Sequence, residues 1–210
     1  NGTDVPSNVF AAHQKRVAGI LLAHYESVIP YFGKLATREF KRRRGMLERK
    51  RTDSAFIRMM EWASTRALAN AKSIADTDIG DVRTAIENGL AAGLGNAEIA
   101  RGVRKVSTTT PYRAATVART ETHAAATYGA IEEARTTSEE IGIKLVKAWV
   151  PTMDDRTRPE HAAMANEEPI ALDEQFSVGG EMLDRPGDPS GSPENVINCR
   201  CAILTEEAPE

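Results

Sequence analysis

The chain has little of what marks a secreted, membrane-spanning or phosphate-loop protein. Two cysteines in 210 residues are too few for a disulfide scaffold and suit a reducing compartment. The longest apolar runs, such as residues 19–23, are too short for a transmembrane helix or for the core of a signal peptide. A glycine-rich phosphate loop of the Walker type is absent from the sequence. We therefore expect no membrane partner and a protein that stays in the cytoplasm of its maker.

Aromatic residues are also scarce, at 5% of the chain, but the overall composition is that of a globular protein. Hydrophobic residues make up 41% and charged residues 27%. This is enough apolar material for a core in one larger domain or two small ones. The chain begins with Asn1 and not with methionine, from which we expect a processed, tagged or partial product.

The net charge of −3 hides an uneven distribution of charge along the chain. Residues 1–105 hold 18 Lys and Arg against 11 Asp and Glu, a balance of +7, whereas residues 106–210 hold 9 against 19, a balance of −10. A basic half and an acidic half are expected to meet different partners.

The first half predicts helices. Apolar residues from Val9 to Ile29 follow the three-and-four spacing of an amphipathic helix, which Pro30 is expected to end. The apolar residues expected together on one side of the helix that starts after Asp53 are Phe56, Ile57, Met60, Ala63, Ala67, Leu68 and Ile74. In all, further helices are predicted from Tyr31 into the basic residues near 44, from Asp53 onward, and over residues 79–92, 96–106 and 112–135.

From Ile143 the pattern changes to strands and loops. Residues 143–150 and 196–204 are β-prone, and a short strand is expected near residues 176–178. The predicted fold class is α+β: an N-terminal helical region followed by a small C-terminal α+β module, with a short antiparallel sheet and long structured loops. We place the basic helical region at residues 1–108 and the module at residues 109–210.

Five short motifs stand in order in the last third of the chain. They are K-x-W at 147–149, D-x-R-T-R-x-x-H at 154–161, F-x-x-G at 176–179, P-G-D-P-x-G at 186–191 and N-C-R-C at 198–201, preceded by A-R-T-E at 118–121. In this order they resemble the C-terminal signature of the phage Mu F-like minor head proteins, the phage head morphogenesis family. The resemblance covers roughly residues 113–204.

This resemblance implies a minor capsid protein of a tailed phage or prophage. Such a protein is associated with the portal and the capsid interior, passes through the host cytoplasm during assembly, and assists head assembly and DNA packaging or ejection. The expected partners are the portal protein, other capsid components and packaged double-stranded DNA bound without sequence preference. The resemblance implies this role and no particular reaction, and we expect no enzymatic activity because the sequence shows no convincing catalytic constellation.

The cysteine pair Cys199-x-Cys201 is compatible with zinc, with His161 and Asp154 or Asp155 as further ligands. If residues 196–204 form one strand, however, both cysteines share a face with Ile197 and Ile203, as in a buried core. Zinc sites also normally place two residues between paired cysteines. We expect reduced, metal-free cysteines that lie with Trp149 in the core, and no cofactor. A zinc site at Asp155, His161, Cys199 and Cys201, or a redox pair, is the alternative.

The opposite face of that strand would carry Asn198 and Arg200 toward the loop that follows Pro151. We expect Arg200 and Arg158 to clamp the loop aspartates, because bidentate Arg–carboxylate pairing is strong and specific. His161 is expected to satisfy a buried carbonyl, and the helical triplet 119–121 to dock on the same loop. The predicted polar network comprises Arg119, Glu121, Asp154, Asp155, Arg156, Arg158, His161, Asn198 and Arg200.

Two other functions compete with the structural one. The first is a metal-dependent hydrolase or nuclease at the Asp/His/Cys loop, although no nucleophile with a base and oxyanion donors is recognisable. The second is a DNA-binding protein that uses residues 79–106 as a helix-turn-helix, a pattern that an ordinary helical hairpin shares. A nucleotide-transferring toxin fold is disfavoured because Arg119 is in a helical context and no Gln-x-Glu or Glu-x-Glu strand follows.

The segment 41–51 carries seven cations and one anion in eleven residues. This density favours phosphate contacts, but a solvated helix face or docking on an acidic protein surface such as the portal ring is equally compatible. No aromatic residue interleaves with the cations, so stacking on single strands is not indicated. The candidate DNA or portal contacts are Lys41, Arg42, Arg43, Arg44, Arg49, Lys50 and Arg51.

Overall fold

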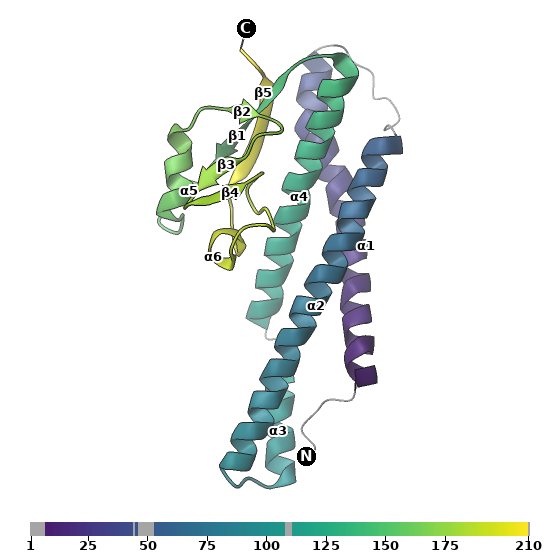
Figure 1. Cartoon of the computed structure of the whole chain (residues 1–210), viewed down its shortest axis with the longest axis vertical. Helices are drawn as coiled ribbons and strands as arrows, with labels where there is room; N and C mark the ends of the chain where they lie inside the picture. Colours follow the sequence, from purple (N-terminus) through teal and green to yellow (C-terminus); the bar gives the residue numbers. More distant parts are fainter. Residues whose placement is uncertain (1–6, 44, 46–52, 108–110, 210) are drawn as a thin grey trace. The chain divides into compact units, whose positions relative to one another are not determined.

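The computed structural model describes residues 7–43, 45, 53–107 and 111–209 (Figure 1). Long helices come first and short strands with long loops come last, so the predicted α+β class is confirmed. The long helices are α1 (Ser7–Arg43), α2 (Asp53–Ala91), α3 (Asn96–Ser107) and α4 (Pro111–Ile141). No helix among the described residues has the length and apolar character needed to cross a membrane.

Helix α1 continues through Pro30, so the predicted end at this proline is wrong. Tyr25 and Ile29 are fully buried before the proline, and Thr37 is buried after it. Proline inside a helix costs about 3 kcal/mol through its missing N–H and its steric clash. Fully burying two large side chains contributes about 1.5–3 kcal/mol each. Because the buried stripe spans the proline, packing offsets the local penalty.

Helix α2 joins two predicted helices into one and buries its small residues. Alanines and one methionine at every fourth position form the buried stripe, namely Ala55, Met59, Ala63, Ala67, Ala71 and Ala75. Of the residues expected on one side of this helix, Ala63 and Ala67 are buried, whereas Phe56, Ile57 and Leu68 are exposed, which corrects that part of the prediction. Alanine side chains allow neighbouring helices to approach closely, and the larger side chains then lie outside the contact.

The described chain forms two compact units, each made of two stretches of sequence. The first comprises Asn1–His24 and Ala63–Ala115. In this unit Asp78 accepts hydrogen bonds from His13 Nε2 at 3.0 Å and from Arg113 Nη1 at 2.7 Å. The proposed domain boundary at residue 108 stays a prediction, because residues 108–110 lie outside the described residues.

The second unit comprises Tyr25–Trp62 and Thr116–Glu210. Its helical part contains an aromatic row: Trp62 stacks on Tyr128 at 4.4 Å and meets Tyr25 edge-on at 5.5 Å, between ring centroids. Buried acids of α4 are paired with cations from α1 and α2. Lys41 donates to Glu133 at 2.7 Å, and Arg58 donates to Glu132 at 2.9 Å.

A three-stranded antiparallel sheet of order β2-β1-β5 lies in the second unit. Its strands are β1 (Leu145–Val150), β2 (Ile170–Ala171) and β5 (Ala202–Glu207), and β1 pairs with β5 from Leu145↔Glu207 to Val150↔Ala202. A separate two-stranded sheet contains β3 (Phe176–Val178) and β4 (Glu181–Leu183). The strand near residues 176–178 therefore exists, but it does not join β1 and β5 as expected.

The predicted strand at residues 196–204 is correct only at its end. Residues Pro193–Val196 form the short helix α6, and β5 begins at Ala202. Asn198 has φ of 56°, in the left-handed region that asparagine tolerates and an extended strand does not contain. The two cysteines consequently lie in an irregular segment between α6 and β5.

The remaining short elements are α5 (Pro159–Ala163) and the 3-10 helix η1 (Met164–Asn166), which follow the loop after β1. The core of the module combines residues from both sheets and from these connections. It contains Trp149, Met164, Phe176, Val178, Leu183, Cys199 and Cys201.

Candidate functional site

One face of α4 holds the N-C-R-C segment in place. Thr120 Oγ1 accepts a hydrogen bond from the Asn198 amide at 3.1 Å. Arg119 donates to Asn198 Oδ1 from Nε at 3.3 Å and from Nη2 at 3.2 Å. One turn further along α4, His123 Nε2 donates to the Cys201 carbonyl at 2.7 Å. These contacts fix both ends of the segment that carries the cysteines.

The triplet 119–121 therefore docks on a different target from the one expected. Arg119 binds Asn198 and not the aspartate loop. Glu121 is buried and accepts a 2.6 Å hydrogen bond from the Tyr25 hydroxyl of α1. The triplet thus links the N-C-R-C segment to the helical part of the same unit.

The P-G-D-P loop packs against the same helix. Thr127 Oγ1 donates to the Pro186 carbonyl at 2.9 Å. Gly187 has φ of +73°, and a Cβ there would lie 2.5 Å from His123 Nδ1, so both conformation and space require glycine. Asp188 closes the turn by accepting the Asp184 amide at 2.7 Å and the Ser190 amide at 3.0 Å.

The predicted polar clamp exists in part. Arg200 donates to both oxygens of Asp154, at 2.6 and 2.5 Å, and these hydrogen bonds hold the pKa of that carboxyl well below its usual range. The side chains of Asp154 and Arg200 are 29% and 34% exposed, so solvent reaches this pair. Asp155 is exposed, and Arg156 Nη2 lies 3.5 Å from Asp154.

Arg158 makes a different contact from the one predicted. Its Nη2 donates to the Ile197 carbonyl at 2.7 Å, which ties the start of α5 to the end of α6, and it does not clamp an aspartate. Main-chain carbonyls of an irregular segment need such donors, because they have no strand partner.

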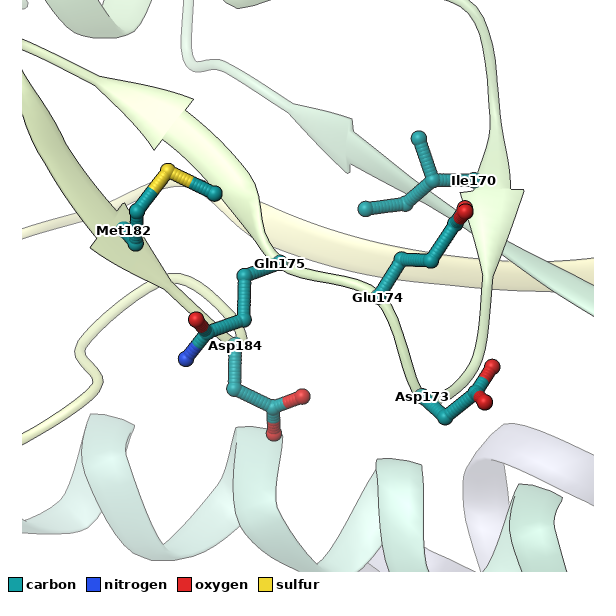
Figure 2. Close-up of a pocket in the computed structure, with 6 residues that line it drawn as sticks. All are labelled: Ile170, Asp173, Glu174, Gln175, Met182 and Asp184. Carbon is teal, nitrogen blue, oxygen red and sulfur yellow. The ribbon is translucent and has the colours of Figure 1, made fainter.

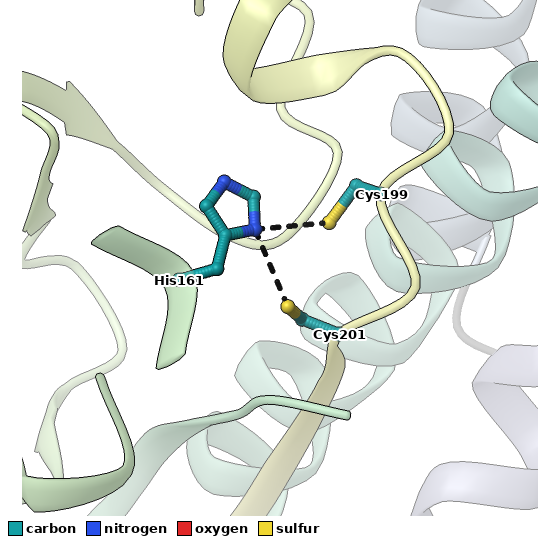
Figure 3. A group of neighbouring side chains, drawn as sticks. All are labelled: His161, Cys199 and Cys201. Atoms are coloured by element: carbon teal, nitrogen blue, oxygen red, sulfur yellow. Dashed lines mark hydrogen bonds between the residues drawn. The ribbon is translucent and has the colours of Figure 1, made fainter. Parts of the chain in front are cut away.

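His161 and the two cysteines converge in the core (Figure 3). His161 Nδ1 lies 3.3 Å from Cys201 Sγ and 3.7 Å from Cys199 Sγ, and Nε2 lies 3.3 Å from Asn195 Oδ1. All three side chains are buried, with His161 only 1% exposed. His161 thus contacts sulfur atoms and an amide, and not the buried carbonyl expected from the sequence.

The cysteines are buried for a different reason from the one proposed. Ile197, expected on the same buried face, is 42% exposed, and Ile203 is partly buried. The Cys199–Cys201 hydrogen bond, with a further bond from His161, lowers the pKa of the Cys201 thiol despite its burial. The same hydrogen bond and burial raise the pKa of the Cys199 thiol.

A buried charge network that the sequence reasoning missed lies beside this cluster. Lys147 is 0% exposed, and its Nζ donates to Asp184 Oδ1 at 2.6 Å and to the Asp184 carbonyl at 2.9 Å. Arg135 and Arg185 also donate to the Asp184 carboxylate, at 3.0 and 3.2 Å. The sequence did contain a signal for the burial of Lys147. Side chains alternate along a strand, so Lys147 shares the inward face of β1 with Leu145 and Trp149.

Asp184 also lines an open recess (Figure 2). Burial alone would raise the pKa of this carboxyl, but Lys147, Arg135 and Arg185 outweigh burial and lower it. Asp184 therefore stays an anion near neutral pH and does not suit the role of a general acid or base. The other lining residues are Ile170, Asp173, Glu174, Gln175 and Met182.

The basic run is only partly described. Lys41 pairs with the buried Glu133 of α4, so it serves an internal ion pair and is a poor candidate for DNA or portal contact. Arg42 is exposed. The structure does not describe the side chain of Arg43. It also does not describe Arg44, Arg49, Lys50 and Arg51.

Comparison with known proteins identifies relatives among phage and bacterial proteins. The chain is 31% identical over 127 residues to "Minor head protein GP7" of Bacillus phage SPP1, which covers 60% of this chain and 40% of that protein. It is 33% identical over 127 residues to "NAD(+)--arginine ADP-ribosyltransferase EFV" of Enterococcus faecalis, which covers 59% of this chain and 25% of that protein. The chain thus spans less than half the length of either relative. No solved structure matches.

The model of one protein family matches residues 80–204, more than half of the chain. The matched region contains α3, α4, the strands β1 to β4 and the start of β5. It also contains every motif described above. The chain belongs to the family described as Phage Mu protein F like protein.

Proposed function

We propose that this chain acts as a minor head protein, which assembles with the portal and other capsid components in the head interior and assists DNA packaging or ejection. The observation that carries the proposal is the family match over residues 80–204, supported by the likeness to a minor head protein. The family match covers the region that holds the N-C-R-C segment and its docking helix.

Exposed apolar side chains support a role in assembly. In the second unit, Tyr31 and Leu35 of α1 and Phe56 and Ile57 of α2 are at least 46% exposed. Exposed large apolar side chains are available for burial against another protein, and they mark an interface where they form a contiguous patch. Burying such side chains on a partner would supply the hydrophobic part of an interface.

The test is co-expression of the chain with the portal protein of the same phage, followed by size-exclusion chromatography and native mass spectrometry. We expect a complex that Leu35→Asp and Phe56→Asp each weaken by at least about tenfold, the range for losing a buried interface contact. Met182→Asp changes an exposed residue of β4 and is the matched control. Elution of the wild-type chain apart from the portal would contradict portal association.

The enzyme alternative rests on the relative named as an ADP-ribosyltransferase, of which the matching region is a quarter. We propose that this chain plays a structural part and not a catalytic one. Asp154 is engaged by Arg200, and His161 faces sulfur and Asn195, so neither is poised to act on a substrate. Incubation with NAD as the ADP-ribose donor and an arginine compound as the acceptor, with nicotinamide release as readout, is expected to give the background rate. Release above that rate would favour the enzyme.

A further inference from the structure

His161, Cys199 and Cys201 present three metal-binding atoms to one point, and these atoms all lie within 4.8 Å of one another. Tetrahedral zinc bound at about 2.0 Å to nitrogen and about 2.3 Å to sulfur holds such a nitrogen and sulfur roughly 3.5 Å apart. The two distances from His161 Nδ1 to sulfur, 3.3 and 3.7 Å, bracket this value. The two sulfurs also lie within 4.8 Å of each other, and a tetrahedral zinc ion would hold them roughly 3.8 Å apart.

The orientation of His161 is the one that a metal ligand needs. Nε2–H is directed at Asn195 Oδ1, and Asn195 is itself oriented by donating from Nδ2 to the Val178 carbonyl at 3.4 Å. This arrangement places the proton on Nε2 and leaves the lone pair of Nδ1 facing both sulfurs. Metal-binding histidines almost always donate their second ring N–H to an oxygen acceptor in this way.

The spacing of one residue between the cysteines is not an obstacle in this fold. On a strand, Cys199 and Cys201 would point to the same face but stay separated along the chain. Here Asn198 is left-handed and the Cys199 amide donates to the Val196 carbonyl at 3.2 Å, so the chain turns. This turn brings both sulfurs to one side of His161 (Figure 3).

A cluster without metal would explain the burial of these residues but not their convergence. One thiol is enough to satisfy Nδ1 of a neutral histidine. Two sulfurs within reach of the same lone pair are what a metal ion bound by all three side chains would require. Two thiolates and an imidazole are a donor set that selects a thiophilic ion such as zinc.

We propose that His161, Cys199 and Cys201 bind one zinc ion, which joins α5 to the segment before β5. A water molecule or a partner side chain would complete the coordination. The loops of this module have little secondary structure, and the ion would cross-link segments that are 38 to 40 residues apart. The role of the ion is to hold the N-C-R-C segment, which docks on α4, in one conformation.

The first measurement is elemental analysis of the full chain purified without chelators. We expect about one zinc per chain, lost in Cys199→Ser, Cys201→Ser and His161→Gln. Arg200→Ala is the matched control, since Arg200 lies between the cysteines but is exposed and bonds Asp154. Zinc that persists in the cysteine variants would place the ion elsewhere and overturn the proposal.

The second measurement uses the wild-type chain alone and does not depend on the folding of any variant. Addition of Co²⁺ to the metal-stripped chain should give cobalt–thiolate charge-transfer bands and the strong visible bands of tetrahedral cobalt. Zinc should remove these bands, raise the melting temperature and slow thiol labelling. If the purified chain holds only background amounts of zinc and cobalt gives no thiolate bands, the proposed zinc site is wrong.

Discussion

At the scale of single residues, the buried pair of Lys147 and Asp184 is the most consequential polar contact of the module. Lys147 is fully buried, and an ammonium ion out of water is tolerated only with a charged partner. Asp184 provides both a carboxylate and a carbonyl oxygen to it. Removal of either partner leaves a charge that the core cannot solvate.

We therefore predict that Asp184→Asn lowers the free energy of unfolding by about 3 kcal/mol, the lower end for breaking a buried pair. Asp173→Asn is the matched control, because Asp173 lines the same recess but is exposed, and it should change stability by less than about 0.5 kcal/mol. Urea unfolding followed by circular dichroism measures both. Equal effects of the two substitutions would show that the Lys147 contact adds nothing.

The same pair predicts a dependence on pH. The pKa of Asp184 is lowered in the folded chain, so its contribution is complete above the ordinary aspartate pKa of about 3.9 and is lost as pH falls through the folded value. The melting-temperature difference between wild type and Asp184→Asn should be constant above about pH 5 and shrink below about pH 4. A difference that grows on acidification would contradict this assignment.

At the scale of secondary-structure elements, α4 and α1 approach each other closely in the helical part of the second unit. A Cβ at Gly129 would lie 2.2 Å from the Ile29 carbonyl oxygen, which is backbone and cannot move aside. Ile29 directly precedes Pro30, so this close contact lies at the proline of α1. Glycine at position 129 is what allows this contact.

We predict that Gly129→Ala lowers the free energy of unfolding by at least about 2 kcal/mol, the middle of the range for overpacking. Gly19→Ala, in α1 with nothing within 4 Å of the added methyl group, should instead raise it by roughly 0.5–1 kcal/mol. Opposite signs of the two changes in chemical denaturation test the close contact. A stabilising Gly129→Ala would mean that the helices are further apart.

At the scale of the whole molecule, the uneven charge of the sequence sets the expected behaviour toward DNA. The basic half carries +7 and the acidic half −10, and Asp and Glu repel phosphate. Any DNA affinity should therefore depend on residues 41–51 and not on the C-terminal module.

We predict weak, non-specific and salt-sensitive DNA binding that the combined change of Arg42, Arg43 and Arg44 to Gln weakens for all sequences alike. Each phosphate contact contributes about −0.9 to the slope of log affinity against log salt, so this slope should flatten. Fluorescence anisotropy with two unrelated duplexes over a salt series measures it. If the triple change spares DNA binding but abolishes portal association, the basic run is a protein-docking surface.

The sequence by itself determined the features that depend on local pattern. The family signature, the α+β class, the start of α3 at Asn96 and the strand before Pro151 all follow from residues close together in the chain. Helix periodicity, helix caps and proline positions depend on residues only a few positions apart. Secondary structure that follows from them can therefore be predicted from the sequence alone.

The tertiary structure alone decided which residues meet. Pro30 fails to end α1 because buried side chains on both sides of it pack as one stripe, and the strand at residues 196–204 is interrupted by the left-handed Asn198. The meeting of His161 with Cys199 and Cys201, like that of Lys147 with Asp184, joins positions 37 to 40 residues apart. Such contacts depend on the path of intervening loops, and no local propensity encodes that path.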